Sequence, residues 1–336
     1  NISILIAGLG YLEMFVPALK NSFILGITVI VLIWAFIFLS LHGVGIITKI
    51  VSITVTMLLI SVIVTGTAGW LDFDIALWES NWNVSGEKNG PAILSGFAVL
   101  IFAFVGVESV ATNNELIENP KKVVPIATII GFIIVAVIYI TSTTVIEGMF
   151  KAKEIQDAPA SFALSMTHIT NSKFIGEAVS LLMAIACIAS FLVWNLSSAS
   201  AAKTSADRGY LPKAYSYTNK YGINSKGLVI NGIIMTLLQV VLMLLGSNVA
   251  SAFNITVTLS VLLLLFPYFW SGIALLKKTM EMGTKGIHNW LIVSISSIFI
   301  ISAFVSATLG ELWLVIALVM IVLAVYAIRL TPNKKS

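Results

Sequence analysis

One acidic residue stands in the middle of an apolar stretch that is long enough to cross a membrane. Glu108 lies within residues 102–109, FAFVGVES, far from either expected membrane surface. A carboxylate at bilayer depth costs about 2.5–3.5 kcal/mol on insertion scales, so such a residue usually faces a cavity and has a function. Gly106 lies between two β-branched valines, where a helix can open and expose backbone groups. Together these features predict a solute site inside a membrane.

The segment that follows indicates how the chain leaves the membrane. Asn119-Pro120 is expected to end a helix, because proline disfavours the α conformation in the residue before it. Lys121 and Lys122 then hold this end in the cytosol, and Pro125 is well placed to begin the next helix. The pattern predicts a half-helix, a break and a second half-helix, an arrangement that holds charged substrates near the midplane in transporters.

The remaining sequence supplies the membrane spans that must position this segment. Hydrophobic residues make up 58% of the 336 residues and charged residues 10%, with a mean hydropathy of +1.02. A soluble domain carries about a quarter charged residues. Residues 1–18 are expected to form the remaining part of a membrane span, so that the sequence starts inside a helix. The complete predicted spans are 22–41, 46–70, 91–113, 123–148, 174–202, 228–247, 250–276, 288–309 and 312–329.

The basic residues predict the orientation of these spans. Alternate loops and the C-terminal tail hold 14 of the 19 lysines and arginines. Cytoplasmic loops carry such an excess, so these loops and the C-terminus are expected in the cytoplasm. The net charge of +4 therefore reports on topology and gives no reason to expect nucleic acid as a partner. With no linker or second soluble region, residues 1–336 are expected to form a single transmembrane domain.

The sequence gives little indication of a metal, cofactor or catalytic site. The single cysteine, Cys187, lies in an apolar stretch, and no CxxC or His-x-x-x-His spacing is present, so neither a metal site nor another cofactor is expected. An enzyme would need paired acids or a nucleophile with its base inside the membrane. Asp72 and Asp74 are the nearest pair, but they lie in a loop with no matching second motif, so an enzyme is not expected.

The motif around Glu108 resembles the sixth helix of a known family. The segments FAFVGVES and ENPKKVVPIAT, in this order, are similar to that helix in the amino acid–polyamine–organocation superfamily. The similarity is closest to bacterial basic amino acid/polyamine antiporters, which exchange arginine for agmatine, lysine for cadaverine or ornithine for putrescine. It continues through 142–149, 187–190, Trp194, 206–212 and Pro267-Tyr268.

The resemblance implies an all-α polytopic membrane protein with an inverted-repeat transporter fold and a discontinuous sixth helix. About ten of twelve helices would be present, with Asn1 in the third and the first two absent. The first helix of the family binds the carboxylate and amino group of the substrate, so we expect that these residues alone do not transport.

The resemblance also implies roles for eight residues. Phe102 stands where the exchangers usually have tryptophan, so it keeps an aromatic plug but offers a weaker cation–π surface. Packing explains the aromatic residues equally well, Glu108 could instead be paired with a hydroxyl or backbone amide, and Ser260 could bond to its own helix. The expected substrate-binding residues are Asn1, Phe102, Val105, Gly106, Trp194 and Ser260, and the expected proton-coupling or gating residues are Glu108 and Tyr268.

The function expected from the resemblance is exchange of a basic amino acid for its decarboxylated amine by alternating access. Proton-coupled amino acid symport remains an alternative, as does a non-transporting sensor on the same fold. The expected surroundings are the lipid bilayer of the bacterial inner membrane, and the resemblance is compatible with a homodimer.

Overall fold

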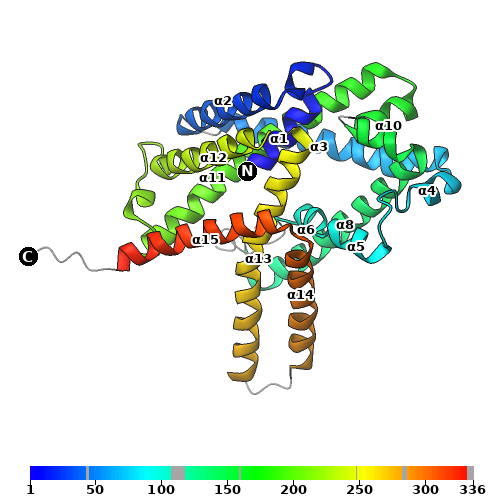
Figure 1. Ribbon diagram of the computed structural model, residues 1–336. Coiled ribbons are helices and arrows are strands. Elements are labelled where there is room, and N and C mark those ends of the chain that lie inside the picture. Colours follow the sequence, from blue (N-terminus) through cyan, green and yellow to red (C-terminus); the bar gives the residue numbers. More distant parts are fainter. Residues whose placement is uncertain (43–44, 107–117, 159, 247, 282–285, 331–336) are drawn as a thin grey trace, which may run out of the picture. The chain divides into compact units, whose positions relative to one another are not determined.

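The computed structural model describes residues 1–42, 45–106, 118–158, 160–246, 248–281 and 286–330 (Figure 1). Within these ranges the chain is helical, with no β-strand, so the all-α prediction is confirmed. The α-helices are α1 Ile2–Leu12, α2 Ser22–Leu41, α3 Gly45–Ala68, α4 Ile75–Asn81, α5 Asn89–Ser95, α6 Phe97–Ala103, α8 Pro120–Met149, α9 Ala152–Asp157, α10 Ser161–Thr170, α11 Lys173–Asp207, α12 Ser225–Leu244, α13 Val249–Glu281, α14 Ile287–Ser306 and α15 Leu309–Leu330. The 3₁₀ helices are η1 Pro17–Lys20, η2 Gly69–Asp72 and η4 Lys213–Ser216.

Seven helices in the described ranges are long and apolar enough to cross a membrane. The predicted span 22–41 coincides with α2, and the other long helices overlap their predicted spans. An apolar helix of about 20 residues matches the thickness of a hydrocarbon core. The chain is therefore a multi-pass membrane protein, as its composition predicts.

The N-terminal span is shorter than predicted. The expected span 1–18 is wrong in its extent, because α1 ends at Leu12 and a 3₁₀ helix begins at Pro17. Val16 has φ −127°, outside the helical region, as expected for a residue before proline.

The described helices form two compact units, each built from separated segments of the chain. The first contains residues 1–82, 136–253 and 325–336, and the second contains 83–135 and 254–324. The predicted single transport domain, with its inverted repeats, stays a prediction.

In the first unit, α11 packs against α1, α3, α10 and α12. Helix α1 runs antiparallel to α11, with Ser180 Oγ donating to Tyr11 O (2.7 Å) near one end and Asn1 bonded to Ser198 at the other. The helices approach closely at Gly8, where an added Cβ would lie 3.1 Å from Cys187 Cβ. A small residue at such a crossing lets two membrane helices pack backbone to backbone.

One asparagine secures the end of α8 in this unit. Asn81 Nδ2 donates to the carbonyl oxygens of Glu147 (2.7 Å) and Phe150 (2.8 Å), and Asn81 Oδ1 accepts from Ala152 N (3.0 Å). These bonds satisfy backbone groups that the ends of α8 and α9 leave without helical partners.

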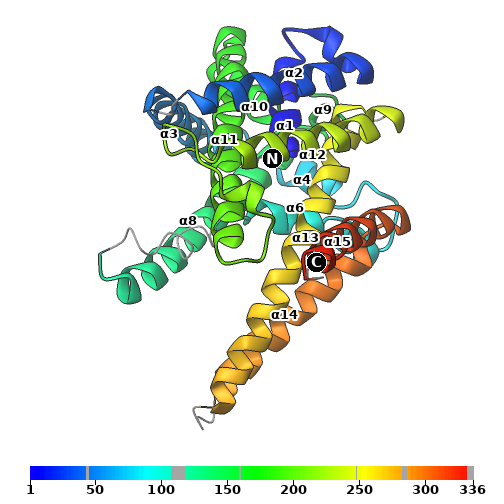
Figure 2. The same ribbon diagram turned by 90° about the vertical axis from the view of Figure 1, so that its left-hand side faces the viewer.

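In the second unit, α13 and α14 lie side by side and antiparallel (Figures 1 and 2). Asn289 Nδ2 donates to Thr279 Oγ1 (2.7 Å) near their connection, and Phe266 packs edge-on against Phe304 toward the other end. A buried cluster of Val261, Leu265 and Ala303 joins the two helices. Phe102 and Tyr268, two of the predicted site residues of this unit, pack against the cluster.

Candidate functional site

The helix that carries the FAFVGVES motif ends before its glycine. Helix α6 stops at Ala103, and Phe104 N and Val105 N then bond to the carbonyls of Ile101 (3.0 Å) and Phe102 (3.1 Å), three residues back. Gly106 has φ 117°, a conformation that glycine adopts far more readily than other residues. The helix therefore opens at the predicted place. Glu108 and the predicted half-helix after it lie outside the described residues.

Two predicted aromatic residues pack against the same buried cluster in the second unit. Phe102 in α6 and Tyr268 in α13 are both half-buried and pack against the Val261, Leu265 and Ala303 cluster. An aromatic side chain from the broken helix thus shares an apolar base with one that directly follows Pro267 of α13. Each combines packing with partial exposure, as an aromatic wall of a ligand site requires.

Ser260 lies immediately before this cluster. Its hydroxyl donates to Thr256 O at 2.7 Å, the local bond within a helix that serines commonly make. The hydroxyl proton is therefore engaged within α13, and Ser260 could offer a ligand only its acceptor lone pairs.

Asn1 and Trp194 lie in the first unit. Asn1 Nδ2 donates to Ser198 Oγ at 3.4 Å, and Ser198 lies one helical turn after the half-buried Trp194 on α11. Residues four apart share a helix face. Asn1 therefore contacts α11 one turn from Trp194, and the expectation that both border a substrate site stays a prediction.

Two polar residues near this contact were not predicted from the sequence. Asn231 Nδ2 of α12 donates to the same Ser198 Oγ at 3.3 Å. Asn195 is fully buried on α11, and neither its Nδ2 nor its Oδ1 has a hydrogen-bond partner in the described part of the chain. Both interrupt predicted apolar spans, and such an interruption by a polar residue was the available signal.

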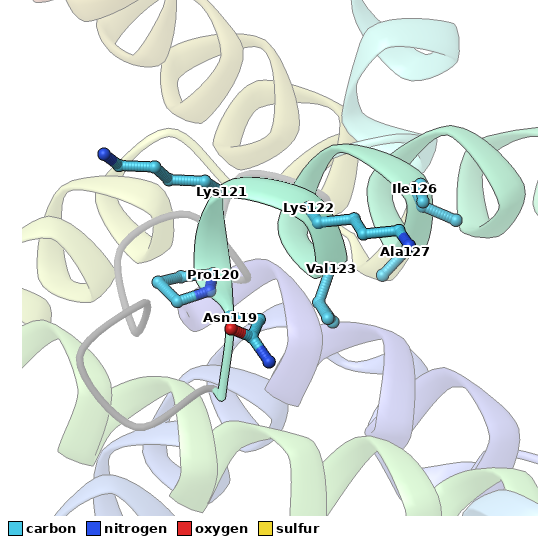
Figure 3. A pocket seen from close by; sticks show the side chains of 7 residues that line it. All are labelled: Asn119, Pro120, Lys121, Lys122, Val123, Ile126 and Ala127. Carbon is cyan, nitrogen blue, oxygen red and sulfur yellow. The ribbon is translucent and has the colours of Figure 1, made fainter.

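An open cavity of about 720 Å³ lies at the start of α8 (Figure 3). In Figure 3 the side chains of Lys121 and Lys122 point away from each other, so they do not converge on one anionic group. The lining includes none of the predicted site residues that the structure describes. The lining residues are Asn119, Pro120, Lys121, Lys122, Val123, Ile126 and Ala127.

Helix α8 begins earlier than predicted. Pro125 was expected at its first turn, but the helix begins at Pro120, and Pro125 lies inside it. Proline is favoured at the first helical position, because its missing N–H would have no helical acceptor there. Asn119, the residue before it, has φ 53° and forms the turn into the helix.

Comparison with known proteins supports the resemblance. A family model described as amino acid permease matches residues 1–333. The cadaverine/lysine antiporter of Escherichia coli (strain K12) is 32% identical over 280 residues, which are 82% of this chain and 63% of that protein. The putrescine transporter PotE of the same organism is 32% identical over 275 residues, 82% of this chain and 62% of that protein. PotE of Haemophilus influenzae is 30% identical over 275 residues, with the same coverage.

The chain thus spans less than two thirds of the length of these relatives. The family and the relatives are permeases, antiporters and transporters, which confirms the prediction of a transport family over an enzyme. With residues 1–333 matched, the chain belongs to the amino acid permease family of the amino acid–polyamine–organocation superfamily.

Proposed function

We propose that this chain forms most of a secondary active transporter that exchanges a basic amino acid for its decarboxylated amine. The observation that carries the proposal is the opening of α6. The helix ends at Ala103, and Gly106 has φ 117° between the half-buried Phe102 and the mid-span Glu108. An interrupted membrane helix exposes backbone dipoles to a charged solute, and the helix ends are the ion sites of many transporters.

The roles proposed for the site residues are those that the resemblance implies. Val105 and Gly106 offer backbone groups at the break, and Phe102 covers the solute with Tyr268 as a gate. Trp194 and Asn1 border the side chain of the solute, and Ser260 offers an acceptor. The similarity to a cadaverine/lysine antiporter and to putrescine transporters supports cationic solutes of this size. An aromatic face near an ammonium or guanidinium group adds a favourable cation–π contribution.

We place the protein in the bacterial inner membrane with its C-terminus in the cytoplasm. Of the 19 lysines and arginines, 14 fall in alternate loops and the tail. This asymmetry sets the orientation of membrane helices. Import of an amino acid in exchange for a more highly charged amine would then remove positive charge from the cell.

A proton-coupled amino acid symporter is the second candidate. It is favoured by Glu108, an acid in the middle of a predicted span. Acidic residues inside membrane spans form proton relays in many pumps and transporters, so such a residue could carry the coupled proton. The two candidates differ in whether a counter-substrate is required.

Flux into liposomes distinguishes these functions. The full-length natural protein that contains these residues is reconstituted into liposomes loaded with agmatine, cadaverine, putrescine or buffer alone. Uptake of labelled arginine, lysine and ornithine is then measured with and without a pH gradient. Uptake only into amine-loaded liposomes supports exchange, and the fastest pair gives the substrate. Equal uptake into empty liposomes driven by a pH gradient contradicts exchange in favour of symport, and absence of flux with every pair contradicts both.

A further inference from the structure

One hydroxyl group joins three helices of the first unit. Ser198 Oγ of α11 accepts hydrogen bonds from Asn1 Nδ2 of α1 (3.4 Å) and from Asn231 Nδ2 of α12 (3.3 Å). The same oxygen donates to the Asn195 carbonyl oxygen of its own helix at 3.0 Å. A serine hydroxyl has one proton and two acceptor lone pairs, so these three bonds use its whole capacity.

This saturation determines which way the two side-chain amides are turned. The hydroxyl proton of Ser198 is donated to the backbone carbonyl of Asn195. The hydroxyl can therefore accept hydrogen bonds from Asn1 and Asn231 but cannot donate to them. An amide oxygen facing Ser198 would oppose a lone pair, whereas an amide NH₂ group forms a bond. Asn1 therefore uses its donor end on Ser198, and its Oδ1 is left as the end available to another group.

The orientation of Asn1 matters for a cationic solute. Ammonium and guanidinium groups carry donors only, so they need acceptors such as an amide oxygen. If Asn1 presented its NH₂ group instead, two donors would face each other. The direction of one side-chain amide can therefore decide whether a basic or a neutral side chain is accepted.

We propose that Ser198 and Asn231 are positioning residues that fix the Asn1 amide with its oxygen toward the cationic end of the substrate. The inference rests on the proposed function, in which Asn1 borders the substrate. Asn231 acts through Ser198, because its bond occupies the second lone pair and holds the hydroxyl between the two helices. Neither residue is assigned a contact with the substrate itself.

The test uses the full-length protein and the tightest-binding of labelled lysine, ornithine and arginine. Ser198→Ala removes the acceptor that fixes Asn1, and Ser198→Thr keeps a hydroxyl at the same place. We expect Ser198→Ala to raise the Kd of the basic amino acid at least fivefold and Asn231→Leu to raise it at least twofold. Norleucine, which resembles lysine without its side-chain ammonium group, is the neutral competitor. In Ser198→Ala, the affinity for norleucine relative to that for the basic amino acid should rise.

A matched control comes from another interhelical bond on α12. Thr236 Oγ1 accepts from Trp34 Nε1 of α2 at 3.1 Å, a bond that involves neither Asn1 nor Ser198. Thr236→Val removes that bond and should lower the Tm to a degree similar to Ser198→Ala, while leaving the Kd within twofold of the wild-type value. Ser198→Thr should also bind within twofold of wild type.

The outcomes separate this inference from the proposed function. If wild type binds a basic amino acid and Ser198→Ala binds it equally well, the positioning role is wrong and the proposed function stands. The same holds if Ser198→Thr and Ser198→Ala weaken binding equally. If wild type binds none of the three amino acids, the proposed function is wrong, and this inference falls with it.

Discussion

Phe102 of α6 and Tyr268 of α13 lie against the same buried cluster of Val261, Leu265 and Ala303. One side chain belongs to the helix that opens at Gly106, and the other directly follows a proline inside a long helix. A movement of α13 at Pro267 would therefore displace Tyr268 from the surface against which Phe102 also packs. The proposed roles of Phe102 as a plug and Tyr268 as a gate would make use of this shared surface.

The first prediction concerns the aromatic group at Phe102. Phe102→Trp should tighten binding of the basic amino acid about threefold to tenfold, because tryptophan offers a stronger cation–π surface, worth roughly 1 kcal/mol. Phe102→Ala should weaken it by at least tenfold. Binding to the purified full-length protein is the measurement.

Phe97→Leu is the control for Phe102. Phe97 also belongs to α6, but its ring centroid lies 5.7 Å from that of Phe299 in α14. Equal effects of Phe97→Leu and Phe102→Ala would mean that Phe102 only supports packing.

The second prediction concerns the backbone at Gly106. A side chain at φ 117° is strained, at a cost of about 1–3 kcal/mol, so Gly106→Ala should shift or close the break and reduce exchange by at least tenfold. The control is Gly131→Ala inside α8, where an added Cβ meets no atom within 4 Å. That change should raise stability slightly, because alanine favours a helix over glycine. The initial rate of exchange and the Tm are measured for both variants. If Gly106→Ala exchanges substrate at the wild-type rate, the break in the helix does not depend on glycine.

Most of the architecture could be predicted from the sequence, because apolar spans and proline positions follow from the chemistry of the bilayer and of the backbone. The span 22–41 and the opening before Gly106 agree with the structure. The start of α8 was missed, since Pro120 and Pro125 are both acceptable at a first turn and the helix begins at the earlier one.

The polar interior was harder to predict. Asn1 and Ser260 each have hydrogen-bonding groups engaged with α11 or with their own helix, and no spacing in the sequence shows this. Asn231 is far from Asn1 in sequence, and their shared contact with Ser198 depends on how three helices pack. Such polar contacts between distant parts of the sequence can be identified only in the folded structure.

The third prediction concerns protonation at Glu108, which rests on the sequence. Acidic residues inside membrane spans often serve as proton relays in pumps and transporters. Glu108→Gln mimics the protonated form permanently and should make the exchange rate nearly independent of pH between about 5 and 8. Glu118→Gln, at an exposed position before α8, is the control and should keep the wild-type pH profile. An unchanged profile in Glu108→Gln would remove Glu108 from proton coupling.

The last prediction uses two buried asparagines with opposite hydrogen bonding. Asn195 is fully buried without a partner for its side-chain amide in the described part of the chain, whereas Asn224 donates to Ala199 O (2.7 Å) and accepts from Gly227 N (2.9 Å). An unsatisfied buried polar group costs about 1–3 kcal/mol, so Asn195→Leu, a similar volume without that group, should leave the Tm unchanged or raise it.

Asn224→Leu, the matched comparison, breaks two bonds and leaves their backbone partners unsatisfied. It should destabilise the protein by about 1–3 kcal/mol. Thermal unfolding of both variants in the same detergent tests the contrast. A loss of stability in Asn195→Leu as large as that in Asn224→Leu would mean that the Asn195 amide is satisfied in the membrane, as it would be by a buried water molecule.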